Sequence, residues 1–371
     1  MLTKFKVQNF RGFKEEFTFN LNPVKSYTFN LDCIENGVVK KAIIQGKNGS
    51  GKSNLGLALI ELTQHLSTKV SDVAQKQSYS IFSHASLRDE VTKFEHQFLF
   101  GSDTVRYQYQ KLGPSDICSE FLWINDELVI KYEFGSDIWT NLSGTETLKK
   151  DIGETKLSAL KYIHLNSVLT PDDSRANIFK KFYAFVEAML LFKSVEGFGF
   201  IGGWPSDNLL VDIKKRNALP EFQQFLNAAG INLNLEFEEI NGVDILMAVF
   251  ESGKIGFWEI ASSGTRSLVL FYHWLQRLRN NEVSFVFIDE FDAFYHFELA
   301  EEVFLMLKKA NPQVVVTTHN SALMNNELSR PDCNFIIENN KIQPIYSLSS
   351  KELREAHNIE KIYRSGGFNG V

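Results

Sequence analysis

The chain has 371 residues, 44% of them hydrophobic, so it can form one large domain or two smaller ones with a substantial core. Its net charge of −6 argues against a dedicated DNA-coating protein, because such proteins are usually basic. Three cysteines, far apart along the chain, give neither a disulfide framework nor a zinc-binding spacing. The composition is typical of a reducing cytosol, so we expect a cytoplasmic protein.

The most membrane-like stretch, residues 182–204, is interrupted by Glu187, Lys193 and Glu196. A spanning helix needs a longer uncharged run, so we expect a buried or interface helix followed by a glycine-rich turn, and no membrane association.

The first element with a chemical motif is an apolar run at residues 42–44, followed by a glycine-rich loop and an apolar helical pattern. The loop has the complete P-loop spacing, Gly46-x-x-x-x-Gly51-Lys52-Ser53, in the strand–loop–helix context that confirms it. Glycines let backbone N–H groups turn toward an anion, and the helix N-terminus adds positive charge. We expect Lys52 to reach the β- and γ-phosphates of ATP and the Ser53 hydroxyl to bind Mg²⁺. The ATP-binding residues assigned here are Gly46, Asn48, Gly49, Gly51, Lys52, Ser53 and Asn54.

The middle of the chain shows no chemical motif, only alternating patterns. Strands are predicted at residues 94–100, 105–112, 127–134 and 159–165, helices within 172–230, and strands again at 233–240, 244–251 and 254–260. No heptad repeat is sustained, so a long coiled coil is not expected. The helical stretch has the size of a small subdomain, which is either a partner-binding surface or a structural lid.

A serine–glycine turn, Ser262, Ser263 and Gly264, precedes an amphipathic helical pattern. Serine at this position is a common helix N-cap, and a helix N-terminus also binds phosphate. The turn by itself therefore has two interpretations, a cap only or half of an active site.

Two buried strands follow, and each ends in polar residues. The first, at 283–288, leads into Asp289 and Glu290, and the second, at 314–317, leads into Thr318 and His319. The segment between them has the length of one crossover helix. Parallel strands connected by such a helix bring their C-terminal ends together. We expect Ser53 and Asp289 to hold Mg²⁺, and Lys52, Glu290 and His319 to be catalytic. Glu290 would be the general base, and His319 would donate a hydrogen bond to the γ-phosphate.

The order of P-loop, serine–glycine turn, Asp–Glu pair and histidine resembles that of an ABC-type ATPase. More closely, the chain resembles the soluble ABC ATPases of the SMC, RecF and OLD group. Residues 2–21, with the pattern "NFRGF", are similar to the first strand pair of that group, and "DEFDAFYH" resembles its Walker B segment with the D-loop. The tail, residues 351–371, is similar to the C-termini of ATPases encoded in bacterial anti-phage and abortive-infection operons.

The resemblance implies an α/β P-loop NTPase fold, namely an ABC-ATPase head with a central helical insertion. Residues 1–165 and 233–371 would form the head, and residues 166–232 the insertion. It also implies that Ser262, Ser263 and Gly264 bind the γ-phosphate of ATP held by another subunit. Ala261 and Thr265 depart from the usual signature, and His296 replaces the D-loop aspartate of transporter heads. Arg11 is a candidate nucleotide contact, and Gln97 a candidate for the Q-loop.

The function that follows is an Mg-ATP-hydrolysing ATPase that forms a homodimer around ATP, or a higher homo-oligomer. It would regulate a separate effector, such as a nuclease or toxin, in phage defence. The alternative is a RecF-like repair ATPase that contacts DNA directly. A transporter motor is disfavoured by the long segment between the P-loop and the turn, and by His296. We expect no nuclease activity in this chain, because the acidic residues after His319 lack paired spacing.

Overall fold

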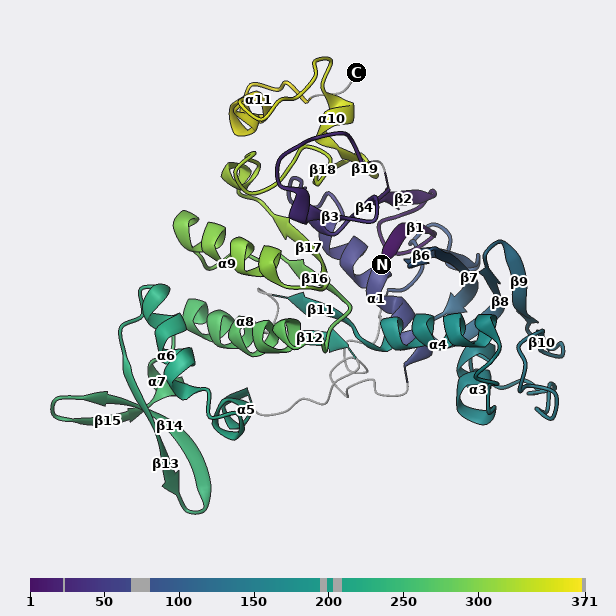
Figure 1. Ribbon diagram of the computed structural model, residues 1–371, viewed down its shortest axis with the longest axis horizontal. Helices are drawn as coiled ribbons and strands as arrows, with labels where there is room; N and C mark the ends of the chain where they lie inside the picture. The colour runs from purple at the N-terminus through teal and green to yellow at the C-terminus, as the bar shows by residue number, and fades with distance from the viewer. Residues whose placement is uncertain (23, 68–80, 194–198, 203–208, 369–371) are drawn as a thin grey trace.

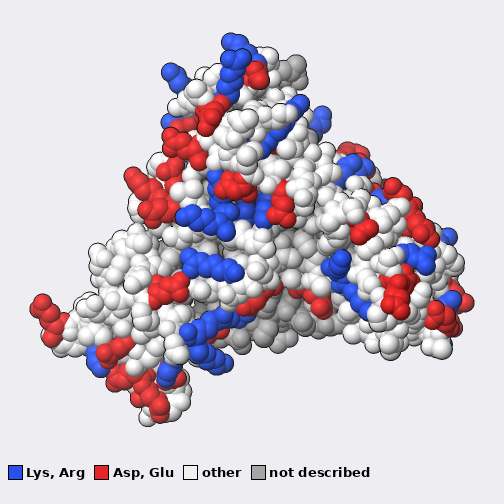
Figure 2. Space-filling model, viewed as in Figure 1, with Lys and Arg blue, Asp and Glu red and all other residues white. Residues whose placement is uncertain are grey.

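Two seven-stranded sheets form the body of the protein, and helix α1 (Lys52–Leu66) lies between them (Figure 1). The structure, a computed structural model, describes residues 1–22, 24–67, 81–193, 199–202 and 209–368. Within these ranges, no helix has both the length and the apolar character needed to cross a membrane. On the face shown in Figure 2, the described Lys and Arg side chains are interspersed with Asp and Glu.

The central sheet has five parallel strands and an antiparallel strand at each edge. In spatial order these are β12 (Gly199–Gly202), β11 (Met189–Lys193), β16 (Phe285–Asp289), β17 (Gln313–Thr318), β5 (Lys41–Gln45), β18 (Asn334–Glu338) and β19 (Lys341–Pro344).

Helices cover both faces of this sheet, which explains why its central strands β16, β17 and β5 are buried along their whole length. Successive side chains of β16 point to opposite faces. Phe285 belongs to the cluster formed with α1 and α4 (Ser174–Glu187). Val286 belongs to the cluster formed with α8 (Ser263–Arg279) and α9 (Phe297–Lys309). The strands predicted before the acidic pair and before His319 are present as β16 and β17.

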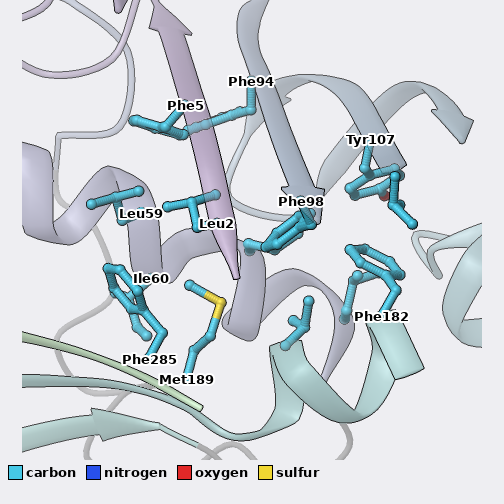
Figure 3. Close-up of a cluster of buried hydrophobic side chains, with 14 of the residues drawn as sticks. Leu2, Phe5, Leu59, Ile60, Phe94, Phe98, Tyr107, Phe182, Met189 and Phe285 are labelled. Carbon is cyan, nitrogen blue, oxygen red and sulfur yellow. The ribbon is translucent and has the colours of Figure 1, made fainter. Parts of the chain in front are cut away.

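The second sheet is antiparallel, and its inner face packs against α1. Its strands in spatial order are β10 (Trp139–Thr140), β9 (Glu127–Glu133), β8 (Asp116–Ile124), β7 (Asp103–Gly113), β6 (Thr92–Phe100), β1 (Leu2–Gln8) and β2 (Phe17–Asn20). Leu2, Phe5 and Phe98 form one buried cluster with Leu59 and Ile60 of α1 (Figure 3). The P-loop helix is therefore held between the two sheets.

Residues 159–165, predicted as a strand, instead form helix α3 (Ala159–Asn166), so that prediction is wrong. Ser158 is its N-cap, and the Ser158 hydroxyl accepts a hydrogen bond from the Lys161 backbone N–H. The buried residues Ala159, Leu160 and Ile163 follow helical spacing. An N-cap serine before that spacing indicated a helix more strongly than the partial alternation indicated a strand.

The stretch at 182–204 also differs from the predicted buried helix and turn. Helix α4 ends at Glu187, and β11 then pairs in parallel with β16 inside the central sheet. The four consecutive apolar residues of β11 fit a buried strand as well as a buried helix, so periodicity could not separate the two. Part of the predicted turn, at 194–198 and 203–204, lies outside the described residues. The region 166–232 thus supplies a core strand as well as helices, and its division as a separate insertion stays a prediction.

A three-stranded sheet projects from the body beside two helices (Figure 1). These elements are α5 (Leu209–Lys215), α6 (Leu219–Ala228), β13 (Asn234–Ile240), β14 (Val243–Phe250) and β15 (Gly253–Gly256). The strand predicted at 254–260 ends early, because α7 (Phe257–Ile260) begins at its fourth residue. Helix α7 leads directly into the serine–glycine turn.

The remaining segments are short. They are η1 (Leu31–Cys33), β3 (Ile34–Glu35), β4 (Val38–Val39), η2 (Ser321–Leu323), α10 (Ile345–Leu348) and α11 (Ile359–Arg364). Two of them, β3 and β4, pair with each other. Two of the three free cysteines, distant in sequence, are neighbours in space: the Cys333 thiol lies 3.8 Å from the Cys33 carbonyl oxygen. Sequence spacing could not show this proximity.

Candidate active site

The P-loop connects β5 to α1, and its glycines are required by the backbone. Gly49 and Gly51 have φ values of 76° and 104°, in a region that residues with a Cβ atom rarely adopt. Gly46 has no room for a side chain, because a Cβ atom there would lie 2.6 Å from the Ile337 side chain and 2.6 Å from the Ser50 hydroxyl. The predicted motif therefore forms a tight loop whose N–H groups precede a helix N-terminus, which is the arrangement that binds phosphate.

Lys52 places its cation inside this loop. Its Nζ donates hydrogen bonds to the carbonyl oxygens of Gly46 at 2.7 Å and Lys47 at 3.1 Å. Burial lowers the pKa of Lys52, while the negative charges of Asp289 and Glu290 act in the opposite direction. A cation in the curve of a glycine loop, with an acidic pair close by, fits an Mg-bound phosphate chain.

The other predicted P-loop residues lie at the opening of the loop. Asn48, Gly49 and Ser53 are exposed. Asn54 Oδ1 accepts a hydrogen bond from Arg11 Nε at 3.0 Å, so Arg11, the candidate nucleotide contact, lies at the start of α1.

The acidic pair and the histidine converge, as predicted from the strand order. β17 pairs in parallel with both β5 and β16, so the three strands end side by side. His319 Nε2 lies 3.5 Å from Glu290 Oε1, and both side chains are about one-third exposed, at 39% and 34%. Asp289 is 7% exposed, at the end of β16. A carboxylate beside a histidine, at the mouth of a phosphate loop, can accept a proton from water.

Glu290 has an unusual backbone, with φ 50°. A non-glycine residue in this region costs about 1–3 kcal/mol and persists only where neighbouring groups hold it. The neighbouring group is Thr317, whose hydroxyl accepts a hydrogen bond from the Glu290 N–H at 2.8 Å and donates one to Asp289 Oδ1 at 2.8 Å. Our reading of the sequence missed Thr317. The available indication was a pair of threonines immediately before the histidine.

The serine–glycine turn caps helix α8, and this contact is compatible with both of its interpretations. The Ser262 hydroxyl accepts a hydrogen bond from the Thr265 N–H at 3.1 Å. A Cβ atom on Gly264 would lie 3.4 Å from the Phe294 carbonyl oxygen, so the turn is next to the D-loop segment of its own chain. Ser262 and Ser263 are exposed. The turn is thus open to solvent rather than bonded into the P-loop of the same chain.

Two weaker candidates are placed elsewhere. The Gln97 amide donates a hydrogen bond to Glu95 on the same strand, β6, in the antiparallel sheet. His296 is the N-cap residue of α9 and lies 4.0 Å from Glu298. Neither contact involves the P-loop.

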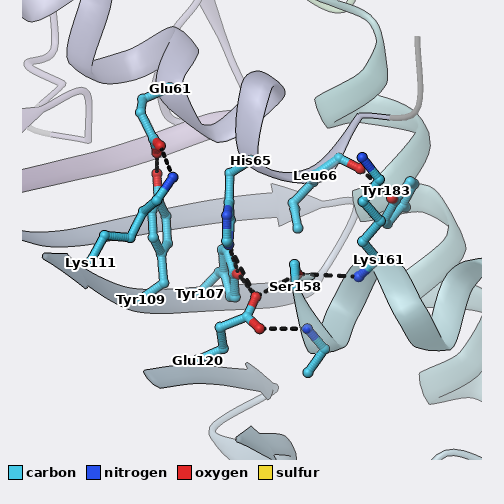
Figure 4. Close-up of polar contacts among 11 residues, drawn as sticks. Glu61, His65, Leu66, Tyr107, Tyr109, Lys111, Glu120, Ser158, Lys161 and Tyr183 are labelled. Atoms are coloured by element: carbon cyan, nitrogen blue, oxygen red, sulfur yellow. Dashed lines mark hydrogen bonds and ion pairs between the residues drawn. The ribbon is translucent and has the colours of Figure 1, made fainter. Parts of the chain in front are cut away.

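Buried polar groups fix the C-terminal half of the P-loop helix (Figure 4). Glu61 accepts hydrogen bonds from the Tyr109 hydroxyl and from Lys111 Nζ, and His65 Nε2 lies 3.0 Å from Glu120 Oε1. Burial by itself would raise the pKa of Glu120, but hydrogen bonds, led by that from His65, lower it below its ordinary value. Breaking such a buried pair leaves an uncompensated charge, so these contacts fix α1 against the antiparallel sheet.

Within the described residues, no group of three or more His, Cys, Asp or Glu side chains is arranged to hold a metal ion. The residues that fit Mg²⁺ are instead the exposed Ser53 hydroxyl and the Asp289 carboxylate. Oxygen ligands of this kind, supplemented by substrate phosphates, are what Mg²⁺ prefers.

Residues 220–325 match the model of a family described as "AAA domain, putative AbiEii toxin, Type IV TA system". This segment contains the serine–glycine turn, the acidic pair and His319, but not the P-loop. No curated protein matches the sequence.

Solved structures with a similar arrangement include the SMC head domain from Thermotoga maritima, at 13% identity and a TM-score of 0.43, covering 93% of this chain and 98% of that one. An SMC head bound to the C-terminal winged-helix domain of ScpA has 13% identity and a TM-score of 0.43, covering 92% and 96%. The Smc head of Pyrococcus furiosus, with an extended coiled coil and bound to the C-terminal domain of ScpA, has 12% identity and a TM-score of 0.44, covering 92% and 95%.

The fold, the converging motifs and the family match define the class of protein. It is a P-loop ATPase, and its residues 220–325 match an AAA-domain family.

Proposed function

We propose that the protein binds Mg-ATP at the P-loop and hydrolyses it with Glu290 as the general base. The observation that carries this proposal is the convergence of Lys52, Asp289, Glu290 and His319 at the ends of three neighbouring parallel strands. Lys52 would exchange its carbonyl partners for phosphate oxygens. Ser53 and Asp289 would hold Mg²⁺, which when bound neutralises phosphate charge.

Glu290 is suited to the proton transfer because it is partly exposed and has His319 as a neighbour. Its carboxylate would orient a water molecule and accept its proton, a contribution of about 10²–10⁴-fold to the rate. His319 would donate a hydrogen bond to the γ-phosphate, so that the terminal phosphate is contacted from the end of β17.

Hydrolysis would take place between two copies of the chain. Ser262 and Ser263 are exposed and Gly264 is half-buried at a helix N-terminus, where the turn can meet a phosphate. Ser262 bonds to its own helix and not to the P-loop of its own chain. The turn can therefore close over ATP bound to the P-loop of a second copy. The ATP-bound form would therefore be a dimer, with each chain contributing to both sites.

We further propose that the ATPase acts in the cytoplasm as a sensor or regulator of a separate effector, such as a nuclease or toxin, in phage defence. The support is the matched family, whose description names a putative AbiEii toxin and a type IV toxin–antitoxin system. ATP-driven closure would change the surfaces available to the effector, which is a coupling between two sites.

The test compares wild-type protein with Glu290→Gln, which keeps the shape of the side chain but removes the base. We expect the variant to bind ATP normally, to turn over at least about 10²-fold more slowly, and to accumulate as a dimer in light scattering with ATP. Unchanged turnover would show that another group is the base. Stimulation of the wild-type ATPase by bare DNA would favour the DNA-repair function instead.

A further inference from the structure

Residues 289–292, which begin at the last residue of β16, contain the proposed metal ligand, the proposed base and the start of the D-loop. Its side chains act only if the backbone of this short turn keeps one conformation. The groups that hold it come from the neighbouring strand β17 rather than from β16 itself.

Thr317 is fully buried and makes three contacts with this segment. Its hydroxyl donates to Asp289 Oδ1 and accepts from the Glu290 N–H, both at 2.8 Å, and its carbonyl oxygen accepts from the Phe291 N–H at 3.1 Å. A single hydroxyl therefore connects the metal ligand to the base. It also satisfies the N–H of the residue whose φ is positive.

Thr318 makes a similar contact one residue later. Its hydroxyl donates to Asp292 Oδ2 at 2.6 Å and accepts from the Asn320 N–H at 2.9 Å. Successive residues of a strand point to opposite faces, so the two threonines support the turn from two sides. His319 follows β17 directly and lies 3.5 Å from Glu290. Three consecutive residues, 317–319, therefore contact this turn.

We propose that Thr317 is a positioning residue for hydrolysis: its hydroxyl fixes the backbone of Glu290 and the carboxylate of Asp289 in the geometry that the reaction requires. This inference rests on the proposed function of Glu290. Thr317 touches neither nucleotide nor water in this role. Its contribution is to keep the strained Glu290 backbone in one conformation, as preorganised sites require.

The central variant is Thr317→Val, which keeps the branched shape but removes the hydroxyl. We expect kcat to fall about 10- to 100-fold, the equivalent of one hydrogen bond to a charged group, while ATP affinity stays within about threefold. Thr317→Ser, which restores the hydroxyl, should recover most of kcat. In nucleotide-free protein, amide hydrogen exchange across residues 289–292 should be faster in Thr317→Val than in wild type, and slow again in Thr317→Ser.

The matched control is Thr63→Val, which removes another buried threonine hydroxyl, bonded to the Val186 carbonyl oxygen at 3.1 Å, away from the turn. It should change neither kcat nor exchange at 289–292. If Thr317→Val does not fold, Thr317→Ala replaces it with the same expectation.

Two results would overturn the inference: a folded Thr317→Val with kcat within about threefold of wild type, or a Thr317→Ser as inactive as the valine variant. Failure of the proposed function gives a different pattern. Wild-type protein would then not hydrolyse ATP, or Glu290→Gln would remain active, and the exchange measurement would still decide whether Thr317 holds the turn.

Discussion

Ser262→Arg tests whether the exposed turn is half of an active site or only a helix cap. The substitution removes the hydroxyl that accepts the Thr265 N–H, and loss of an N-cap costs about 1 kcal/mol, so the chain should still fold. Nucleotide binding by one chain should persist, because Ser262 makes its contacts with its own helix and not with the P-loop. Closure of two chains should fail, because a long cation would occupy the surface that meets the second copy.

Mixing this variant with Lys52→Ala in equal amounts gives a quantitative expectation for the ATPase activity that returns. Each variant alone has no complete composite site, but a mixed dimer has one, built from the P-loop of the Ser262→Arg chain and the turn of the Lys52→Ala chain. Random pairing makes half of the dimers mixed, with one working site of two. Activity should therefore return to about a quarter of the wild-type value.

The assay is steady-state phosphate release at a fixed total concentration, with the two variants measured separately and mixed. The matched control is Asn358→Arg, which makes the same change at the N-cap of α11, where Asn358 accepts the Lys361 N–H at 2.7 Å. It should keep full activity. Full activity of Ser262→Arg alone, or no recovery on mixing, would refute the composite-site reasoning.

Three further outcomes are expected. Lys52→Ala should abolish measurable ATP binding in a calorimetric titration, since the loop loses its phosphate counter-charge; near-normal affinity would remove the P-loop assignment. Burial lowers the pKa of Lys41 to about 7, from an ordinary value of 10.5. Between these two values the unfolded chain binds more protons than the native state. The free energy of unfolding should therefore rise by about 2 kcal/mol from pH 7 to 9. Urea unfolding of Lys41→Met should lack that rise, and an equal rise in both proteins would contradict the assignment. Purified protein should not cut DNA with Mg²⁺; cleavage that survives ion exchange and Glu290→Gln would show a nuclease in this chain.

The sequence by itself determined the chemistry that depends on short spacings. The P-loop could be predicted because its glycines, Lys52 and Ser53 act within one turn and one helix start, so eight residues contain the whole requirement. The cap at Ser262 is local in the same way. The convergence of Glu290 and His319 was also predictable, because a crossover helix between two buried strands forces their C-terminal ends together.

Only the tertiary structure decided the features that depend on which strands become neighbours. Thr317 could not be singled out, because its role depends on β17 lying beside β16 in register, a contact between residues 28 positions apart. The strand β11 could not be predicted for a related reason: its run of four apolar residues is too short to separate a strand from a helix, and its pairing with β16 settles the choice. The proximity of Cys33 and Cys333 could not be predicted from the sequence either. These cysteines are 300 residues apart and become neighbours only when the two ends of the chain pack together. Local spacing fixes local conformation, whereas long-range contacts depend on how the whole core packs.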